Sequence, residues 1–282
     1  MLCDCHVHIV GPIGDCPQVA NRTYIADLAP VETLARLGME RGFTRFVIVQ
    51  PSFYGTDNTV TLKALDDLKG NGRGVAVLDP QNVTPEQLED FSRRGVRGLR
   101  MNLYSPMKAA GSKSLGDSFS AMAHLARDMK WHVQVIAPLG ILLESEDLLA
   151  QSPVPVVIDH YGVYGQSRPD SGEGRRLLGL MRRPHIWMKL SAPYRQGDDD
   201  PLRTEPDREW LSAQIAAAPD RCVWGSDWPF APPHGWHKGG DKVTPYRELS
   251  YAELVDNFVA ALPTDKYAMP ILRDNPARLY GF

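Results

Sequence analysis

Short apolar runs alternate with longer segments of helical periodicity along the whole chain. The runs are rich in Val, Ile and Leu, which is typical of strands buried on both faces of a parallel sheet. The longer segments, such as 31–41, 59–68 and 86–94, have the apolar spacing of helices, and the third follows a capping-box pattern, TPEQ, at 84–87. The pattern predicts eight strands, at residues 2–8, 45–51, 73–79, 96–103, 132–137, 154–160, 186–192 and 221–227.

Eight strand–helix pairs in roughly 250 residues predict an α/β protein with a (β/α)8 TIM barrel. The connections from a helix to the next strand are short, whereas the segments that leave the strands are long and rich in Gly and Pro. In this fold the active site is built from the second kind of connection, at the carboxyl ends of the strands. We find no internal repeat or linker, and we therefore expect one domain over residues 1–282.

Composition excludes several classes of protein. A hydrophobic fraction of 43% and a formal net charge of -3, with no basic patch, argue against nucleic-acid or membrane-surface binding. No apolar run reaches the roughly 18 residues of a membrane span, and the start resembles a strand more than a signal peptide. Only four cysteines do not suggest a disulfide scaffold. We expect a cytoplasmic protein with no nucleic-acid or membrane partner, and we leave a homo-oligomer open.

The first predicted strand carries an unusual set of titratable residues. Asp4, His6 and His8 occupy alternate positions, so the period of two places them on one face and puts Cys3 and Cys5 on the other. We expect the cysteines to face the helical layer, where a free thiol packs as a small hydrophobe. The histidine face would then line the active-site side of the barrel.

Further polar residues follow the other predicted strands. A lone histidine at a strand end is more often a packing residue than a functional one. Many titratable groups that converge on one face are different, because burying a charge without a partner costs several kcal/mol. The set therefore predicts a functional site that contains Ser52, Arg100, Asn102, His160, Arg195 and Asp227 in addition to His6 and His8.

The motifs DCHVHIVGP, VIDHYG and VWGSDWP resemble the amidohydrolase superfamily, in its lactonase branch. The resemblance runs along nearly the full chain and includes VIVQPSFYGTDN, GVRGLRMN, IWMKLSAPYR and the ending NPARLYGF. It implies a (β/α)8 barrel, in agreement with the strand count. It also implies a hydrolase that opens the ring of a small carboxylated lactone of the pyrone-dicarboxylate or sugar-acid type.

Metal dependence is left open by the residues. His6, His8 and Asp227 could hold zinc, but metal-dependent relatives add a histidine at the end of the fifth strand or a lysine on the fourth. Here the fifth strand, HVQVIA, ends without such a donor, and the fourth supplies Arg100, which cannot ligate a metal. We expect no cofactor. The alternatives are a mononuclear zinc hydrolase or decarboxylase on the same scaffold, and a lactone isomerase.

Without a metal, the protein must itself deprotonate water and polarise the carbonyl group. Our hypothesis is that Asp227 acts as the general base toward the attacking water. His6, His8 and His160 would donate hydrogen bonds to the carbonyl oxygen as negative charge develops there. The structural alternative for Asp227 is a carboxylate that only caps a turn.

Arg100 and Arg195 match arginines that hold a carboxylate in the resembling lactonases, since a guanidinium can donate two parallel hydrogen bonds. The structural alternatives are a buried ion pair for Arg100 and a solvated charge for Arg195. Tyr24 and Ser52 match substrate-contact positions of the same pattern. Asn102, at a strand end, is a third candidate for substrate binding.

The chain departs from the lactonase pattern at three positions that hold substrate. A second arginine of the pattern is Pro106 here, a tyrosine on the fifth strand is Ile136, and a histidine after Asp-Trp-Pro is Phe230. Lys108 or Lys113 could substitute as point charges. The grip on a second carboxylate is therefore altered, and muconolactones, sugar-acid lactones and other small cyclic esters remain open as substrates.

Overall fold

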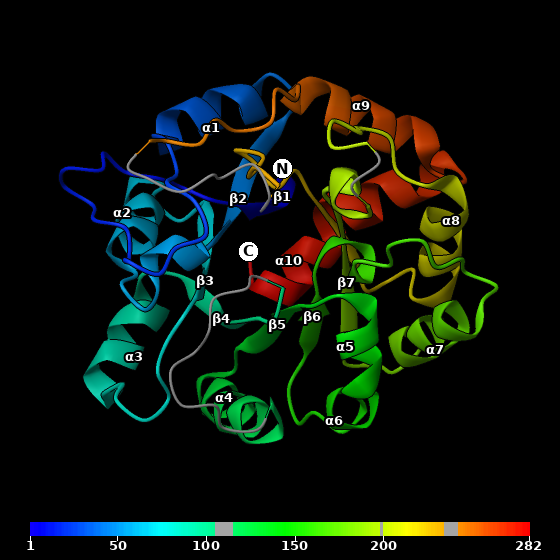
Figure 1. The fold of residues 1–282 in the computed structure, drawn as a ribbon, viewed down its shortest axis with the longest axis horizontal. Coiled ribbons are helices and arrows are strands. Elements are labelled where there is room, and N and C mark those ends of the chain that lie inside the picture. The colour runs from blue at the N-terminus through cyan, green and yellow to red at the C-terminus, as the bar shows by residue number, and fades with distance from the viewer. Residues whose placement is uncertain (105–114, 198–199, 234–241) are drawn as a thin grey trace.

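The computed structural model describes residues 1–104, 115–197, 200–233 and 242–282. One sheet of eight parallel strands runs in sequence order from β1 to β8. A bridge between Val7 and Trp228 joins the two ends of the sheet and closes a barrel (Figure 1). The predicted (β/α)8 fold is confirmed. The strands are β1 (Leu2–Val7), β2 (Phe43–Val49), β3 (Gly72–Ala76), β4 (Val96–Asn102), β5 (His132–Ile136), β6 (Val156–Ile158), β7 (Ile186–Ser191) and β8 (Cys222–Gly225).

Helices surround the barrel and cover the outer face of the sheet (Figure 1). All three predicted helices are present, and Thr84 caps the third through the predicted reciprocal hydrogen bonds with Gln87. None of the helices within the described ranges is long and apolar enough to cross a bilayer. The helices are α1 (Val31–Met39), α2 (Thr59–Asp67), α3 (Pro85–Arg93), α4 (Leu115–Met129), α5 (Leu139–Glu144), α6 (Glu146–Ala150), α7 (Gly172–Met181), α8 (Arg208–Ala217), α9 (Tyr251–Ala261) and α10 (Asn275–Tyr280).

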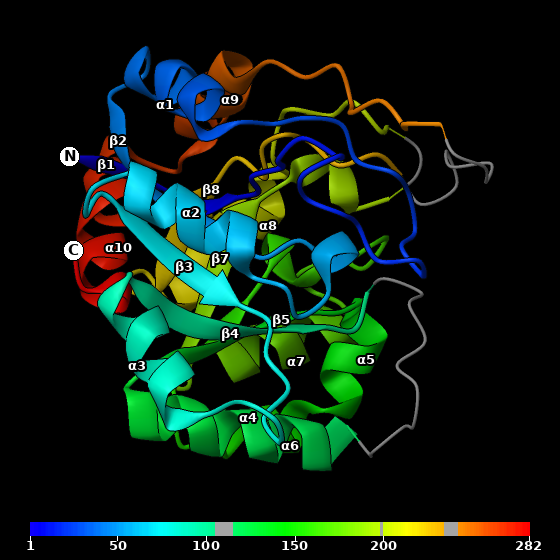
Figure 2. The same cartoon turned by 90° about the vertical axis from the view of Figure 1, so that its left-hand side faces the viewer.

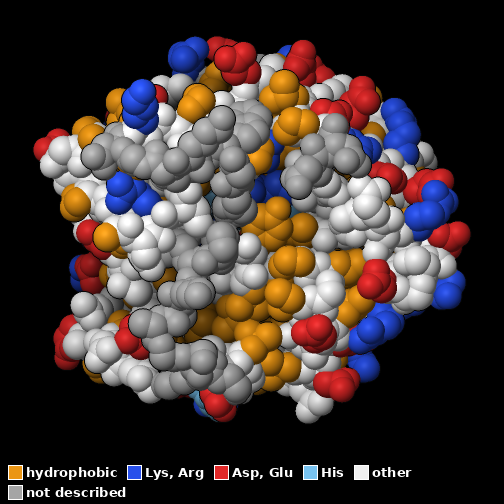
Figure 3. Space-filling model, in the orientation of Figure 1, with side chains coloured by type: hydrophobic (Ala, Val, Ile, Leu, Met, Phe, Trp, Pro, Cys, Tyr) orange, Lys and Arg blue, Asp and Glu red, His pale blue; other side chains and the backbone are white. Residues whose placement is uncertain are grey.

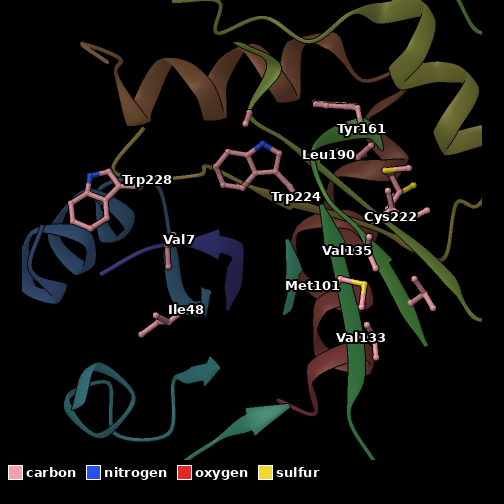
Figure 4. Packing of buried hydrophobic residues seen from close by; sticks show 14 of the residues in the cluster. Val7, Ile48, Met101, Val133, Val135, Tyr161, Leu190, Cys222, Trp224 and Trp228 are labelled. Carbon is pink, nitrogen blue, oxygen red and sulfur yellow. The ribbon is translucent and has the colours of Figure 1, made fainter. Parts of the chain in front are cut away.

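The main hydrophobic core lies between the sheet and the surrounding helices. Alternate strand residues, such as Ile48, Val133 and Val135, belong to it together with Trp224 (Figure 4). The remaining strand positions face the interior of the barrel, where the functional side chains lie. This alternation is what a strand buried on both faces requires.

Helix α10 covers the end of the barrel at which the strands begin, close to the N-terminus (Figure 2). Its Tyr280 packs with alternate residues of the strands, among them Val47 and Val223, in a second buried cluster. Arg73 of β3 donates hydrogen bonds to the carbonyl oxygens of Tyr280 and Gly281, at 3.1 and 2.6 Å. The last residues of the chain therefore form the floor of the barrel.

Cys3 and Cys5 belong to this second cluster, so they line the barrel interior above the floor. The expectation that they face the helical layer was wrong. The reason is a shift in register: Asp4 pairs with Phe46 and Val7 with Ile48, so three steps along β1 oppose two along β2. Such a bulge changes which residues face inward.

Asp4 consequently points the other way from His6 and His8. Its carboxylate accepts a hydrogen bond from the Tyr251 hydroxyl of α9 at 3.0 Å and one from the Ser226 backbone N–H at 2.9 Å. The predicted common face of Asp4 with the histidines was therefore wrong as well. Asp4 ties the first strand to the helical layer, whereas the two histidines face the barrel interior.

Candidate active site

The carboxyl ends of the strands open onto the face shown in Figure 3, where basic side chains lie near the centre beside hydrophobic ones. A small pocket with a volume of about 40 Å³ lies at this face. The residues that line it include the predicted His8, Tyr24, Ser52, Arg100, Asn102 and Arg195, and also Ile136.

Short turns directly after the strands position several of these side chains. Ser52, His160 and Arg195 lie in single 3-10 turns that follow β2, β6 and β7. His160 and Asp227 have positive φ values of 53° and 61°. A left-handed conformation costs a non-glycine residue about 1–2 kcal/mol. Strain of this kind, at the strand ends, accompanies side chains that turn toward the barrel axis.

Asp227 is the buried centre of the site. Its Oδ2 accepts a hydrogen bond from the Tyr194 hydroxyl and one from Arg195 Nε, each at 2.8 Å. Arg195 is thus not a solvated surface charge, because its side chain is 11% exposed and paired with Asp227. The pairing leaves the other oxygen, Oδ1, without a hydrogen-bond donor among the residues described.

Three imidazoles surround this second oxygen. The Nε2 atoms of His8, His6 and His160 lie 3.4, 3.5 and 3.9 Å from Asp227 Oδ1. All four predicted catalytic residues therefore converge on one point. These distances are longer than good hydrogen bonds, so Oδ1 and the ring nitrogens keep bonding capacity for a water molecule or a substrate.

The charge states follow from burial and from the neighbours. Burial alone would raise the pKa of Asp227, but Arg195 and the histidines outweigh it and hold this pKa well below 3.8. Burial lowers the pKa of His6 and that of His160 well below 6.5. At neutral pH the site therefore holds an ionised carboxylate between two neutral imidazoles.

Second hydrogen bonds orient two of the imidazoles. His8 Nδ1 lies 2.7 Å from the carbonyl oxygen of Val49, which can only accept, so Nδ1 carries a proton. His160 Nδ1 lies 2.8 Å from the Ser191 hydroxyl, which can donate or accept. In a neutral His8, Nε2 is consequently an acceptor.

Arg100 is buried at the wall of the pocket, and its Nη1 donates to the Gln50 carbonyl oxygen at 2.9 Å. No carboxylate within the described ranges pairs with it, so it is not a member of a buried ion pair there. Its Nε has no partner among these residues. Unused donors beside a pocket suit an anionic ligand.

The positions at which the chain departs from the lactonase pattern differ in location. Ile136 lines the pocket, and Phe230 is buried directly after the strand-end motif. Pro106, Lys108 and Lys113 lie outside the described residues. The described wall is therefore apolar where the pattern has a tyrosine.

Sequence reasoning missed a polar group directly below the histidines. Lys189 of β7, Gln134 of β5 and Asp159 after β6 are fully buried and contact His6 or one another. The signal was present, because a lysine inside the apolar run IWMKLS and an acid beside His160 are costly to bury without partners. The prediction placed the site at the strand ends, whereas these residues lie below them.

Two groups of side chains could hold a metal ion within the described part of the chain. One contains His6, His8 and Asp227, as predicted for the alternative with zinc, and the other contains His6, Asp159 and His160. Both share His6. His6 is therefore a ligand that either of these metal sites would use.

The barrel and the titratable cluster at its strand ends are those of an amidohydrolase. The family model for amidohydrolases matches residues 3–282, and the chain belongs to this family. The predicted resemblance is confirmed.

Two relatives and one solved structure show which branch of the family this chain is similar to. The 4-sulfomuconolactone hydrolase of Hydrogenophaga intermedia is 29% identical, over 99% of this chain and 88% of that protein. The 2-pyrone-4,6-dicarboxylate hydrolase of Comamonas testosteroni is 29% identical, over 98% and 89%. A solved structure from Pseudomonas putida, described as a candidate 2-pyrone-4,6-dicarboxylic acid hydrolase, has a TM-score of 0.80 at 26% identity and covers 99% of this chain and 97% of that one.

Proposed function

We propose that this protein is a hydrolase that opens the ring of a small carboxylated lactone, with water activated by Asp227 and without a metal. The observation that carries the proposal is the arrangement around Asp227, where one carboxylate oxygen is held by Arg195 and the other faces three imidazole nitrogens. The names of the two hydrolase relatives support a cyclic ester as the substrate.

In this mechanism Arg100 holds the carboxylate of the substrate at the pocket wall. The lactone carbonyl carbon then lies beside a water molecule that donates a hydrogen bond to Asp227 Oδ1. The water oxygen bonds to the carbonyl carbon while its proton passes to Asp227. The ring C–O bond then breaks, and the departing oxygen takes up the proton, so that a hydroxy acid or its keto form is released.

The histidines divide into two roles. His6 and His160 donate from Nε2 to the carbonyl oxygen as its negative charge develops. His8 donates from Nδ1 to a backbone carbonyl, so its Nε2 accepts the second hydrogen of the water instead. This assignment modifies the hypothesis from the sequence, in which all three histidines donate to the substrate.

Positive charges beside two of the candidate ligands, Asp227 and His6, count against zinc, whereas His8 has the Nδ1–H donation to a carbonyl oxygen that a zinc ligand makes. Arg195 Nε lies 2.8 Å from Asp227 Oδ2, and the ammonium group of Lys189 lies 3.4 Å from Nδ1 of His6. A metal ion at His6, His8 and Asp227 would be placed next to these positive charges. A zinc-bound histidine also donates its other ring N–H to an acceptor, and the ammonium group beside His6 offers none. Asp159 Oδ1 lies 3.3 Å from Nδ1 of His6 but accepts no hydrogen bond among the described residues.

The test is a screen of small lactones at neutral pH that records proton release with and without a chelator. The panel should contain pyrone dicarboxylate, muconolactones and aldonolactones. We expect at least one carboxylated lactone to be hydrolysed at the same rate after chelation. Loss of activity together with a stoichiometric zinc would contradict the metal-free mechanism. Conversion of one lactone into another without proton release would show an isomerase instead.

A further inference from the structure

Lys189 is a fully buried lysine inside the barrel, below the histidines of the site. Three acceptors surround its ammonium nitrogen: Gln134 Oε1 at 2.6 Å, His6 Nδ1 at 3.4 Å and Asp159 Oδ1 at 3.7 Å. An ammonium group has three N–H donors and no acceptor, so it matches this set. A buried cation with such partners is costly to place and suggests a role beyond packing.

The contact with His6 bears on which ring nitrogen carries the proton. An ammonium group can only donate, so a hydrogen bond from Lys189 to Nδ1, at 3.4 Å, uses the lone pair of Nδ1 and places the proton of a neutral ring on Nε2. Nε2 is the nitrogen that lies 3.5 Å from Asp227 Oδ1. It has no hydrogen-bond partner among the described residues and faces the equally unpartnered Oδ1 of Asp227.

The alternative would be a proton on Nδ1 that is donated to Asp159. Asp159 Oδ1 lies 3.3 Å from His6 Nδ1, a distance similar to that of Lys189. This oxygen nevertheless accepts no well-aligned hydrogen bond within the described part of the chain. The other oxygen of Asp159 accepts from Gln134 Nε2 at 2.9 Å, and Gln134 in turn accepts from Lys189. The network therefore favours the ammonium group as the partner of Nδ1.

We propose that Lys189 is a positioning residue that holds His6 in the tautomer with its proton on Nε2. This state makes His6 a hydrogen-bond donor to the substrate, a role that rests on the proposed function, and it makes His6 unable to bind a metal through Nε2. A zinc ligand needs the opposite tautomer, with Nδ1–H donated to a carboxylate or carbonyl group. Lys189 thus makes His6 a hydrogen-bond donor and not a metal ligand, although the position of His6 would allow either role.

The first experiment uses the intact protein with ¹⁵N-labelled histidine. NMR spectra distinguish the two tautomers, and a His6→Asn variant assigns the His6 signals by their loss. We expect the proton of His6 on Nε2. A proton on Nδ1 in the unmodified protein would overturn the proposal, and this result does not depend on the folding of any variant.

The second experiment replaces the lysine by the apolar Lys189→Met. With Nδ1 free, His6 can donate to Asp159, so we expect the tautomer to switch. We also expect kcat for the lactone found in the screen to fall about 10–100-fold, with KM little changed, and zinc affinity measured by titration to rise by a similar factor. The matched control is Lys63→Met, whose lysine is on the surface and pairs with Asp67. This control should leave all three quantities unchanged.

The outcomes separate this inference from the proposed function. Suppose that no lactone is hydrolysed, but that His6 carries its proton on Nε2 and this proton moves to Nδ1 in Lys189→Met. The proposed function then fails, and the role of Lys189 in setting the tautomer stands. If lactones are hydrolysed but the tautomer and zinc affinity are the same with and without the lysine, the inference fails. Lys189→Gln, which keeps an N–H donor without the charge, should restore part of the donor tautomer.

Discussion

Asp227 uses its two carboxylate oxygens for different partners. Arg195 and Tyr194 hold Oδ2, and this contact fixes the carboxylate so that Oδ1 faces the imidazoles of the site. The sequence could place Asp227 and the histidines at strand ends, but it could not assign these partners. They depend on side-chain geometry that no periodicity records. Arg195, which was expected to hold substrate, therefore also fixes the Asp227 carboxylate.

Asp227→Asn should lower kcat by about 10²–10⁴-fold, because an amide cannot accept the proton of the attacking water. Product binding should change little, since the substitution keeps the shape of the side chain. Steady-state kinetics and product inhibition measure the two effects. Asp170→Asn is a suitable control, because Asp170 is exposed and lies on the surface. Near-normal turnover of the Asp227 variant would refute its role as base.

Arg100→Met should raise KM for a carboxylated lactone by about 10–150-fold. This factor corresponds to the loss of one hydrogen bond to a charged group, which contributes about 1.5–3 kcal/mol. Arg100→Lys should recover part of the binding because the charge remains while the two parallel donors are lost. Arg93→Met removes an exposed arginine and should have no effect. If KM is unchanged in the Met variant, Arg100 does not bind the carboxylate of the substrate.

At the scale of the element, the sequence predicts where β1 lies but not which of its side chains face inward, because β1 contains a bulge. The strands were found close to their observed bounds because apolar runs and turn residues mark them. The alternation inside β1 was wrong because one additional residue between Asp4 and Val7 turns Asp4 outward. No glycine marks this bulge in the sequence. Lys189 and Asp159 were missed for a different reason: the sequence shows both residues, but the prediction placed the site at the ends of the strands and not below them.

Tyr251→Phe tests the contact between β1 and α9. The variant removes the hydroxyl that donates to the buried Asp4 at 3.0 Å and leaves the carboxylate with one partner fewer. We expect the free energy of unfolding to fall by about 1–3 kcal/mol, as measured by urea denaturation. Tyr267→Phe is the control, since the ring of Tyr267 contacts Lys266 through its face. An equal effect of the two substitutions would show that the Asp4 contact contributes nothing.

At the scale of the whole molecule, the barrel explains why residues predicted at separate strand ends lie close together. Eight parallel strands in sequence order bring all their carboxyl ends to one face, so residues as distant as His6 and Asp227 meet. A polar motif at the carboxyl end of any strand therefore lies at this one face. Residues 105–114 and 234–241, which follow β4 and β8, are not among those described, so the predictions for Lys108 and Lys113 stay predictions.

Stability should decrease as the pH falls from 7 to 5. Burial lowers the pKa of His132 to about 3 and holds the pKa of His6 and of His160 well below 6.5. These side chains bind protons near pH 6.5 only when the chain unfolds, so below that pH the unfolded state takes up more protons and is favoured. Each histidine contributes about 1.4 kcal/mol per pH unit in this window.

Asp4 acts in the opposite direction. Burial raises its pKa from 3.8 to about 6, so the folded state binds the additional proton below pH 6 and gains stability there. This effect offsets about one histidine, and we expect a net loss of roughly 3 kcal/mol per pH unit between pH 6 and pH 5. Urea denaturation at several pH values measures it. Constant stability over this range would show that the histidines are protonated in the folded protein.

The closure of the barrel between β1 and β8 also has a consequence for biosynthesis. The backbone hydrogen bonds from Asp227 to His6 and from His8 to Trp228 join segments more than two hundred residues apart. A nascent chain that is elongated at about 5–20 residues per second must hold its first strand without this neighbour for many seconds. During that time the unpaired edge of β1 is open to pairing with other chains, which exposes the nascent protein to aggregation until β8 has been made.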